Sequence, residues 1–229
     1  MTELEAIKER FSVRKYIERP LADNVVEALK EKITECNAKG SLHIQLVLNE
    51  PKAFNGIMAY GSFSGVSNYL VMAGRKDCTL DERIGYYGEQ LVLLAQQLGL
   101  GSCWVGLTYN KVKEAYTLND GEKVVCLIAL GYHNATRRNH HRKSIEDVSN
   151  ADATTPAWFR NGVEAALMAP TAINQQKFYF KYIPQKAEEK SHVAAMRRFS
   201  IVGYTLIDLG IAKLHFELAA GKDNFVWEK

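Results

Sequence analysis

Two arginines and a serine lie close together near the amino terminus, in the segment 10–16 (RFSVRKY). The guanidinium group of arginine presents a planar set of donors that matches phosphate oxygens, and a serine hydroxyl adds another donor. Arg10, Ser12 and Arg14 could therefore form a cradle for an anion. Taken alone, however, the segment is better explained as a surface loop with two solvated arginines.

A second polar segment, 169–176 (APTAINQQ), lies between a predicted helix and a predicted strand. Pro170 ends the helix, and the small residues beside it let the backbone approach a flat ligand. Asn174 and Gln176 carry both donors and acceptors, which recognition of the edge of a heterocycle requires. Ordinary capping and turn chemistry explains this segment better when it is considered alone.

A third candidate runs from Gly85, through a helix with small residues on its buried face, to a glycine-flanked strand end at 101–106 (GSCWVG). This arrangement leaves space and free backbone N–H groups, although periodicity assigns it first to the core. Its glycines are not a dinucleotide fingerprint, because Gly99 and Gly101 follow a helix rather than a strand. The sequence has no P-loop and no spacing of histidines that would indicate a metal site.

Hydrophobic periodicity predicts the elements that position these segments. Because strands and helices do not alternate strictly, the pattern indicates an α+β fold. The polar stretch 144–156 is predicted to be a linker. Helices are predicted over residues 2–10, 25–33, 81–98, 111–116, 157–168 and 202–220. Strands are predicted over residues 43–48, 68–73, 103–105, 124–132, 178–183 and 225–227.

Composition narrows the class of protein. The 229 residues are 47% hydrophobic with a net charge of +3, which is typical of a globular protein and does not require a nucleic-acid partner. No apolar run reaches the roughly 20 residues of a membrane span, and the amino terminus lacks a secretory signal. The four cysteines are scattered and predict free thiols in a reducing compartment. We therefore expect a cytoplasmic protein with no membrane partner.

The basic cluster 133–143 (HNATRRNHHRK) keeps one further alternative open. Such a cluster is most simply a solvated loop, but it could also serve a nucleic-acid-binding module. Binding that weakens steeply with salt would support that weaker alternative.

The two halves of the chain repeat each other faintly. Gly88 and Gly99 bracket one long predicted helix, and Gly210 and Gly221 bracket another with the same spacing. Chance similarity between amphipathic helices explains the repeat equally well. If the repeat is real, two related halves are fused in one chain.

Taken together, the three segments resemble the nitroreductase-like family of FMN-dependent oxidoreductases, in particular its TM nitroreductase branch. The resemblance covers most of residues 3–147 and the segment around 157–183. It implies a nitroreductase-like fold of mixed, mostly antiparallel sheets packed with helices. In that family an Arg-x-Ser-x-Arg segment contacts the phosphate and ribityl chain of FMN. The matching residues here are Arg10, Phe11, Ser12 and Arg14.

The resemblance implies further cofactor contacts. A Leu-Gly-Leu-Gly-Ser-Cys-Trp-x-Gly run is typical of the family and stands here at 98–106. Backbone N–H groups just after its Trp usually face the reactive flavin nitrogen, which implies Val105, Gly106 and Leu107. A basic stretch usually gives the phosphate another cation, which implies Arg142, with His140 where the family often has Lys. Candidates for the substrate side are Tyr60, Phe63, Tyr86 and Tyr87.

The chain also departs from the family pattern. An Ala-Pro-Ser-x-x-Asn-x-Gln-Pro-Trp segment ordinarily follows the first helix pair, but residues 34–39 lack it. The match appears instead at 169–176, with Thr171 for Ser and 177–178 (KF) for Pro-Trp. In dimeric members this segment contacts the FMN of the other subunit, so the resemblance implies that one chain imitates the dimer. The implied contacts from the second half are Pro170, Thr171, Ala172, Asn174 and Gln176.

The same resemblance implies two domains, 1–147 with the phosphate site and 148–229 completing the flavin site. A mirror-image site should be inactive, because residues 150–157 (NADATTPA) contain no arginine. We therefore expect one FMN per chain, and a monomer that mimics a dimer or a weak homodimer.

The implied activity is NAD(P)H-dependent reduction of a small organic substrate, with hydride passing ping-pong through FMN and NAD(P)H as a transient reductant. No side chain is assigned as catalytic, because the flavin carries the chemistry. A flavin-binding carrier or redox sensor without turnover is the alternative. A globular domain with no ligand would leave three coincident segments unexplained.

Overall fold

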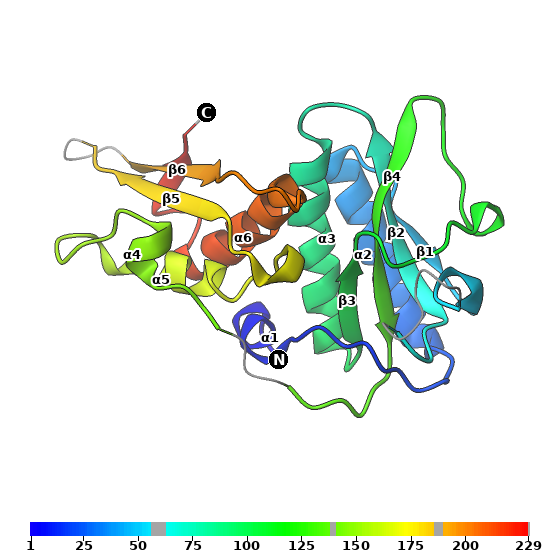
Figure 1. The fold of residues 1–229 in the computed structure, drawn as a ribbon. Coiled ribbons are helices and arrows are strands. Elements are labelled where there is room, and N and C mark those ends of the chain that lie inside the picture. Colours follow the sequence, from blue (N-terminus) through cyan, green and yellow to red (C-terminus); the bar gives the residue numbers. More distant parts are fainter. Residues whose placement is uncertain (56–62, 138–140, 186–189, 229) are drawn as a thin grey trace.

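A computed structural model describes residues 1–229 except 56–62, 138–140, 186–189 and 229. Two β-sheets lie on opposite sides of a pair of long helices (Figure 1). The first sheet has the strand order β1-β2-β4-β3, and all its neighbours are antiparallel. Its strands are β1 (Gln45–Val47), β2 (Asn68–Arg75), β3 (Gly101–Val105) and β4 (Glu122–Gly131).

The second sheet has the order β5-β6-β7. Strands β5 and β6 are antiparallel, whereas β6 and β7 are parallel. The expected α+β class with mostly antiparallel sheets is therefore confirmed. The strands are β5 (Phe178–Ile183), β6 (Ser191–Arg197) and β7 (Phe225–Trp227).

The α-helices vary from one turn to five. A capping box of Thr2 and Glu5 begins the first of them, since each side chain bonds the backbone N–H of the other residue. The helices are α1 (Glu3–Glu9), α2 (Asp23–Gly40), α3 (Leu80–Gln97), α4 (Ile145–Val148), α5 (Ala157–Ala166) and α6 (Thr205–Ala220). Short 3-10 turns occur at Pro51–Ala53, Lys113–Ala115 and Ala172–Asn174.

Helices α3 and α6 pack against each other between the two sheets (Figure 1). Gly85 on α3 faces the carbonyl oxygen of Ile207, and Gly210 on α6 faces the carbonyl oxygen of Glu82. A methyl group at either glycine would overlap that oxygen. The two backbones can therefore touch only because each helix has a glycine at the contact.

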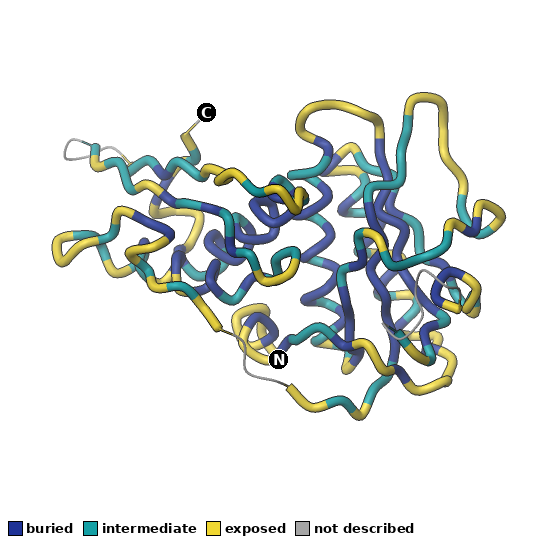
Figure 2. Tube along the Cα trace, viewed as in Figure 1, coloured by how far each residue is buried: buried dark blue, intermediate teal, exposed yellow. Residues whose placement is uncertain are grey.

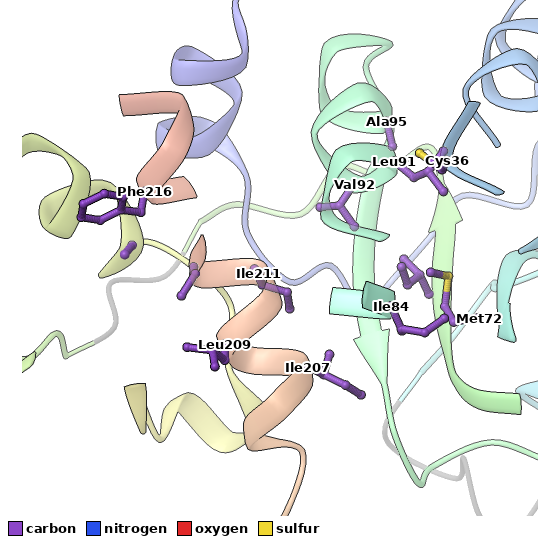
Figure 3. Packing of buried hydrophobic residues seen from close by; sticks show 14 of the residues in the cluster. Cys36, Met72, Ile84, Leu91, Val92, Ala95, Ile207, Leu209, Ile211 and Phe216 are labelled. Atoms are coloured by element: carbon purple, nitrogen blue, oxygen red, sulfur yellow. The ribbon is translucent and has the colours of Figure 1, made fainter. Parts of the chain in front are cut away.

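One hydrophobic core continues across this helix pair. Buried residues of the first sheet, of both helices and of the second sheet belong to one cluster, and the buried parts of the chain gather around the helix pair (Figure 2). Ile84 and Val92 on α3 and Ile207 and Ile211 on α6 belong to the same cluster (Figure 3). None of the described helices is long and apolar enough to cross a membrane.

Strand β2 shows why a buried strand has no alternating pattern. Its residues from Asn68 to Gly74 are all buried, because helices cover one face of the sheet and loops cover the other. Side chains on both faces must then be apolar or small. The run at 68–73 therefore predicted the strand correctly, although it ends two residues later at Arg75.

Three expectations about the elements were wrong. The predicted linker 144–156 contains the short helix α4, which begins at a capping box of Ser144 and Asp147. The segment 111–116 forms only a 3-10 turn. The helix predicted from residue 202 begins at Thr205, because Gly203 and Tyr204 have left-handed backbone angles that a helix does not allow.

Strand β6 was not predicted from the sequence. Its residues (SHVAAMR) lack a clear alternation of apolar and polar side chains, so periodicity alone does not identify them. The segment becomes a strand because it pairs with β5 on one side and with β7 on the other.

Candidate functional site

The amino-terminal arginine segment lies along the edge of the first sheet. Val13 donates its backbone N–H to the carbonyl oxygen of Ser102 at 2.9 Å, and Ser12 bridges to Ser102 at the start of β3. Because side chains alternate along an extended chain, Val13 points into the core while Arg10, Ser12 and Arg14 share the other side. The pairing with β3 therefore places the side chains of Arg10, Ser12 and Arg14 on the side of the segment that faces away from the core.

The segment 170–174 approaches from the second half of the chain. Its backbone turns sharply, with left-handed angles at Ile173 (φ +47°) and Asn174 (φ +57°). The carboxylate of Asp208 on α6 holds this turn, accepting hydrogen bonds from the backbone N–H of Ala172 at 3.0 Å and from the side-chain amide of Gln175 at 2.7 Å. Burial raises the pKa of Asp208 to about 6.

Asn174 and Gln176 both form hydrogen bonds with the backbone of 141–143. Asn174 donates its side-chain N–H to the carbonyl oxygen of His141 at 2.8 Å, and Gln176 donates to the same oxygen at 3.2 Å. The Gln176 side-chain oxygen accepts the backbone N–H of Lys143 at 3.0 Å. These two amides therefore fix the backbone on both sides of Arg142.

Two adjoining cavities lie where the two segments meet. The smaller has a volume of about 240 Å³ and the larger about 700 Å³, and the residues that line both are Ser12, Arg14, Pro170, Thr171 and Ile173. Every residue implied as a cofactor contact lines one or both cavities except Gln176, which is 2% exposed and faces the backbone. Those residues are Arg10, Phe11, Ser12, Arg14, Val105, Gly106, Leu107, Arg142, Pro170, Thr171, Ala172 and Asn174.

The larger cavity is strongly basic. Arg10, Arg14, Arg137 and Arg142 line it, and no carboxylate stands among its described lining residues. The Arg10 side chain is buried, yet its Nε and Nη2 atoms have no hydrogen-bond partner among the residues described. A buried donor without a partner costs about 1–3 kcal/mol, more when charged. An anion in this cavity would remove that cost, so the arginines fit a phosphate.

One wall of the smaller cavity is apolar, and Gly106 and Tyr204 both line it. Gly106 leaves room for the ring of Tyr204, since a Cβ atom there would lie 2.6 Å from the ring. Ile207 and Ile211 on α6 and Trp104 on β3 complete the wall. A flat aromatic ligand whose charged group lies in the larger cavity would fit this shape.

Several lining residues were not predicted from the sequence. Asp208 and Tyr204 belong to the helix and loop of the second half, and Arg137 belongs to the basic cluster 133–143. A sequence signal existed for Asp208, because it is one of only two carboxylates in the mostly apolar run of α6. Arg137 also donates a hydrogen bond to the carbonyl oxygen of Lys8, next to the arginine segment.

The described aromatic candidates for the substrate side, Phe63, Tyr86 and Tyr87, do not line either cavity. Phe63 packs against Phe54 in the core of the first sheet. The Tyr86 hydroxyl donates to Glu217, and that of Tyr87 donates to a backbone carbonyl of α2. Two earlier candidates, Tyr60 and His140, lie outside the described residues.

Comparisons with known proteins agree with the fold. A structure from Thermotoga maritima described as a "putative nitroreductase" is 23% identical with a TM-score of 0.64, and the alignment covers 96% of this chain and 83% of that one. A nitroreductase with bound FMN from Bacteroides fragilis is 19% identical, with coverages of 63% and 96% and a TM-score of 0.49. No protein with a curated description matches the sequence.

A family model described as "Putative TM nitroreductase" matches residues 3–220. The match includes the arginine segment, the strand end at 101–106 and the turn at 170–174, so it spans both walls of the two cavities. The chain therefore belongs to the TM nitroreductase family.

Proposed function

We propose that this chain is an FMN-dependent oxidoreductase that transfers hydride from NAD(P)H to a small organic oxidant. The observation that carries the proposal is the buried guanidinium of Arg10 in a basic cavity, because two of its nitrogens have no hydrogen-bond partner among the described residues and its one ion pair, with Glu89, is long at 3.6 Å. A second cavity, which shares Ser12, Arg14 and Pro170 with the first, has apolar walls that suit a flat ring. Membership of a nitroreductase family agrees with this combination.

The residues present fit FMN. Arg10, Arg14 and Arg142 would contact its phosphate, and the backbone of 105–107 together with 170–172 would enclose its ring. Bound FMN supplies reversible two-electron hydride chemistry. The chain itself binds and orients, and the apolar side chains of Ile207 and Ile211 exclude water from the ring cavity.

The reductant and the oxidant would use one opening in turn. The sequence has no fingerprint for a separate nicotinamide site, and the ring cavity is bordered by exposed apolar side chains, Leu107 (69% exposed) and Ile173 (80% exposed). A flat substrate that covers such side chains gains apolar contact. This arrangement supports a ping-pong reaction in which each ligand leaves before the next binds.

We further propose that the site is completed within one chain, by two related halves at 1–147 and 148–229. The order helix, strand, strand, long helix, strand occurs twice, as α2-β1-β2-α3-β3 and as α5-β5-β6-α6-β7. Strands β2 and β3 both run antiparallel to β4 and hence parallel to each other, as β6 and β7 do. We therefore expect that each chain holds one complete flavin site and that the protein is a monomer.

The visible spectrum of the purified chain tests the proposal. We expect a yellow protein with one FMN per chain that bleaches when NADH or NADPH is added without oxygen. A yellow protein that does not bleach would instead be a carrier or sensor. Two FMN per chain would contradict the single site, and a colourless protein that rejects added FMN would overturn the proposal.

A further inference from the structure

A fully buried carboxylate, Glu89 on α3, lies behind the basic cavity and has no part in the function proposed above. It accepts a hydrogen bond from the Trp104 indole N–H at 2.9 Å. Its other oxygen is 3.0 Å from Nε2 of His215 on α6 and 3.6 Å from Nε of Arg10. Glu89 thus joins the arginine of the anion site to both central helices.

The hydrogen bonds of His215 determine how many protons this cluster holds. Its Nδ1 atom is 3.1 Å from the backbone carbonyl oxygen of Ala165, which can only accept, so Nδ1 carries a hydrogen. Its Nε2 atom faces a Glu89 carboxylate oxygen. A lone pair on Nε2 would repel that carboxylate, so one more proton must lie between the two atoms. Whichever atom holds it, His215 and Glu89 together carry no net charge.

The presence of this proton determines whether the positive charge of Arg10 is available to a ligand. If Glu89 were ionised and His215 neutral, the carboxylate would cancel the charge of Arg10, because Glu89 and Arg10 form an ion pair at 3.6 Å. With the extra proton in place, the pair is neutral and the guanidinium keeps its full positive charge. A buried charge that its neighbours do not compensate attracts a counter-ion strongly, because little water screens it.

No other charged group reaches His215 among the described residues. Helix α5 presents only the carbonyl oxygen of Ala165, and α3 presents Glu89. The neighbouring charged residues of α6 are paired elsewhere: Lys213 with Glu82, and Glu217 with Lys222. The proton shared by His215 and Glu89 is therefore held within this cluster.

We propose that His215 is a positioning residue for anion binding, whose proton neutralises Glu89 so that Arg10 keeps its charge for the phosphate group of a ligand. The identity of that ligand as FMN rests on the proposed function. The charge relationship itself concerns any phosphate monoester.

A pair of substitutions tests this proposal through the sign of their coupling. His215→Gln keeps a neutral donor facing Glu89 but removes the proton, so we expect FMN and inorganic phosphate to bind about tenfold more weakly. Adding Glu89→Gln removes the carboxylate that then cancels Arg10. The double variant should therefore bind within about threefold of the unmodified chain.

A purely structural role for the cluster predicts the opposite coupling. Each substitution would then disturb the packing, and the double variant would bind at least as weakly as His215→Gln alone, which would overturn the proposal. His192→Gln on β6 is the matched control, because His192 is paired with Glu228 far from the cavities and its loss should leave binding unchanged. Circular dichroism of each variant establishes that the chain is folded.

A measurement that needs no flavin tests the proton directly. Nuclear magnetic resonance of the full chain, labelled with nitrogen-15 at histidine and carbon-13 at glutamate, should show either an imidazolium at His215 or an Nδ1–H ring together with a protonated Glu89 carboxyl, whereas an Nδ1–H ring beside an ionised Glu89 would overturn the inference. A neutral ring with its hydrogen on Nε2 alone would overturn the inference. If the chain does not bind FMN but binds inorganic phosphate with the expected coupling, the proposed function fails while this inference stands.

Discussion

The carboxylate of Asp208 accepts a hydrogen bond from the backbone N–H of Ala172 at 3.0 Å, linking the central helix α6 to the turn that closes both cavities. The turn has strained backbone angles, which persist only where surrounding contacts hold them. Asp208 therefore acts as the support of the turn, and its protonation state affects the site and the stability of the fold together.

Replacing Asp208 with Asn should change how stability depends on pH. Burial raises the pKa of this carboxyl from 3.8 to about 6, so between these values the folded chain binds more protons at Asp208 than the unfolded chain does. Its contribution to stability then falls as the pH rises from about 4 to 6, by up to about 3 kcal/mol. Urea unfolding at pH 4 and pH 7 should show that loss in the unmodified chain relative to Asp208→Asn. If the free energy of unfolding depended on pH equally in the two chains, the raised pKa of Asp208 would be contradicted.

Replacing Arg14 with Gln should weaken flavin binding. Arg14 lines both cavities, and hydrogen bonds between a guanidinium and a phosphate contribute about 1.5–3 kcal/mol, or roughly ten- to a hundredfold in affinity. Titration of FMN fluorescence measures the change. Arg19→Gln is the control from the same stretch of chain, since Arg19 lies over the ring of Tyr132 and lines neither cavity. Equal losses in the two variants would show that Arg14 does not contact the cofactor.

Replacing Gly106 with Ala should obstruct the ring cavity. The new Cβ atom would lie 2.6–2.9 Å from the side chain of Tyr204, so the tyrosine must move into space that the ligand needs. We expect FMN affinity to fall while the thermal midpoint changes little, because the Tyr204 side chain is partly exposed. The double variant Gly106→Ala/Tyr204→Ala should recover much of the lost affinity. If the double variant did not recover affinity, the loss in Gly106→Ala would not arise from the clash with Tyr204.

Replacing Gly210 with Ala should destabilise the whole fold. Alanine normally favours a helix over glycine by about 1 kcal/mol, but here its methyl group would overlap the carbonyl oxygen of Glu82 on α3. Separating the two central helices would cost about 1–3 kcal/mol net, as over-packing of a core does. Chemical unfolding gives the free energy. A variant as stable as the unmodified chain, or more so, would mean that the helices do not touch there.

Replacing Ile173 with Asn should stabilise the chain and impair substrate binding. Ile173 has a left-handed backbone angle, which a β-branched side chain tolerates poorly and asparagine tolerates well, so relief of strain should contribute about 1 kcal/mol. The variant also loses an exposed apolar side chain beside the ring cavity, and KM for an apolar oxidant should rise. A fall in stability together with an unchanged KM would refute both roles.

The sequence by itself identified Arg10, Arg14 and Arg142 as candidates for an anion site and determined most of the regular elements. The arginine segment, the strand end at 101–106 and the turn at 169–176 all carry local signals, because their chemistry depends on residue type and short spacing. Strands β5 and β7 were predicted with their observed bounds for the same reason, since each is a short apolar run between breaks.

Tertiary structure alone decided which of these residues line the two cavities. Gln176 carries the same donors and acceptors as a binding residue would, yet it bonds to the backbone of 141–143, because that segment folds over it. Glu89 and His215 are 126 positions apart in the sequence and become one cluster only through the packing of α3 against α6. Contacts between distant segments depend on how whole elements pack, and neither residue type nor local periodicity encodes that packing.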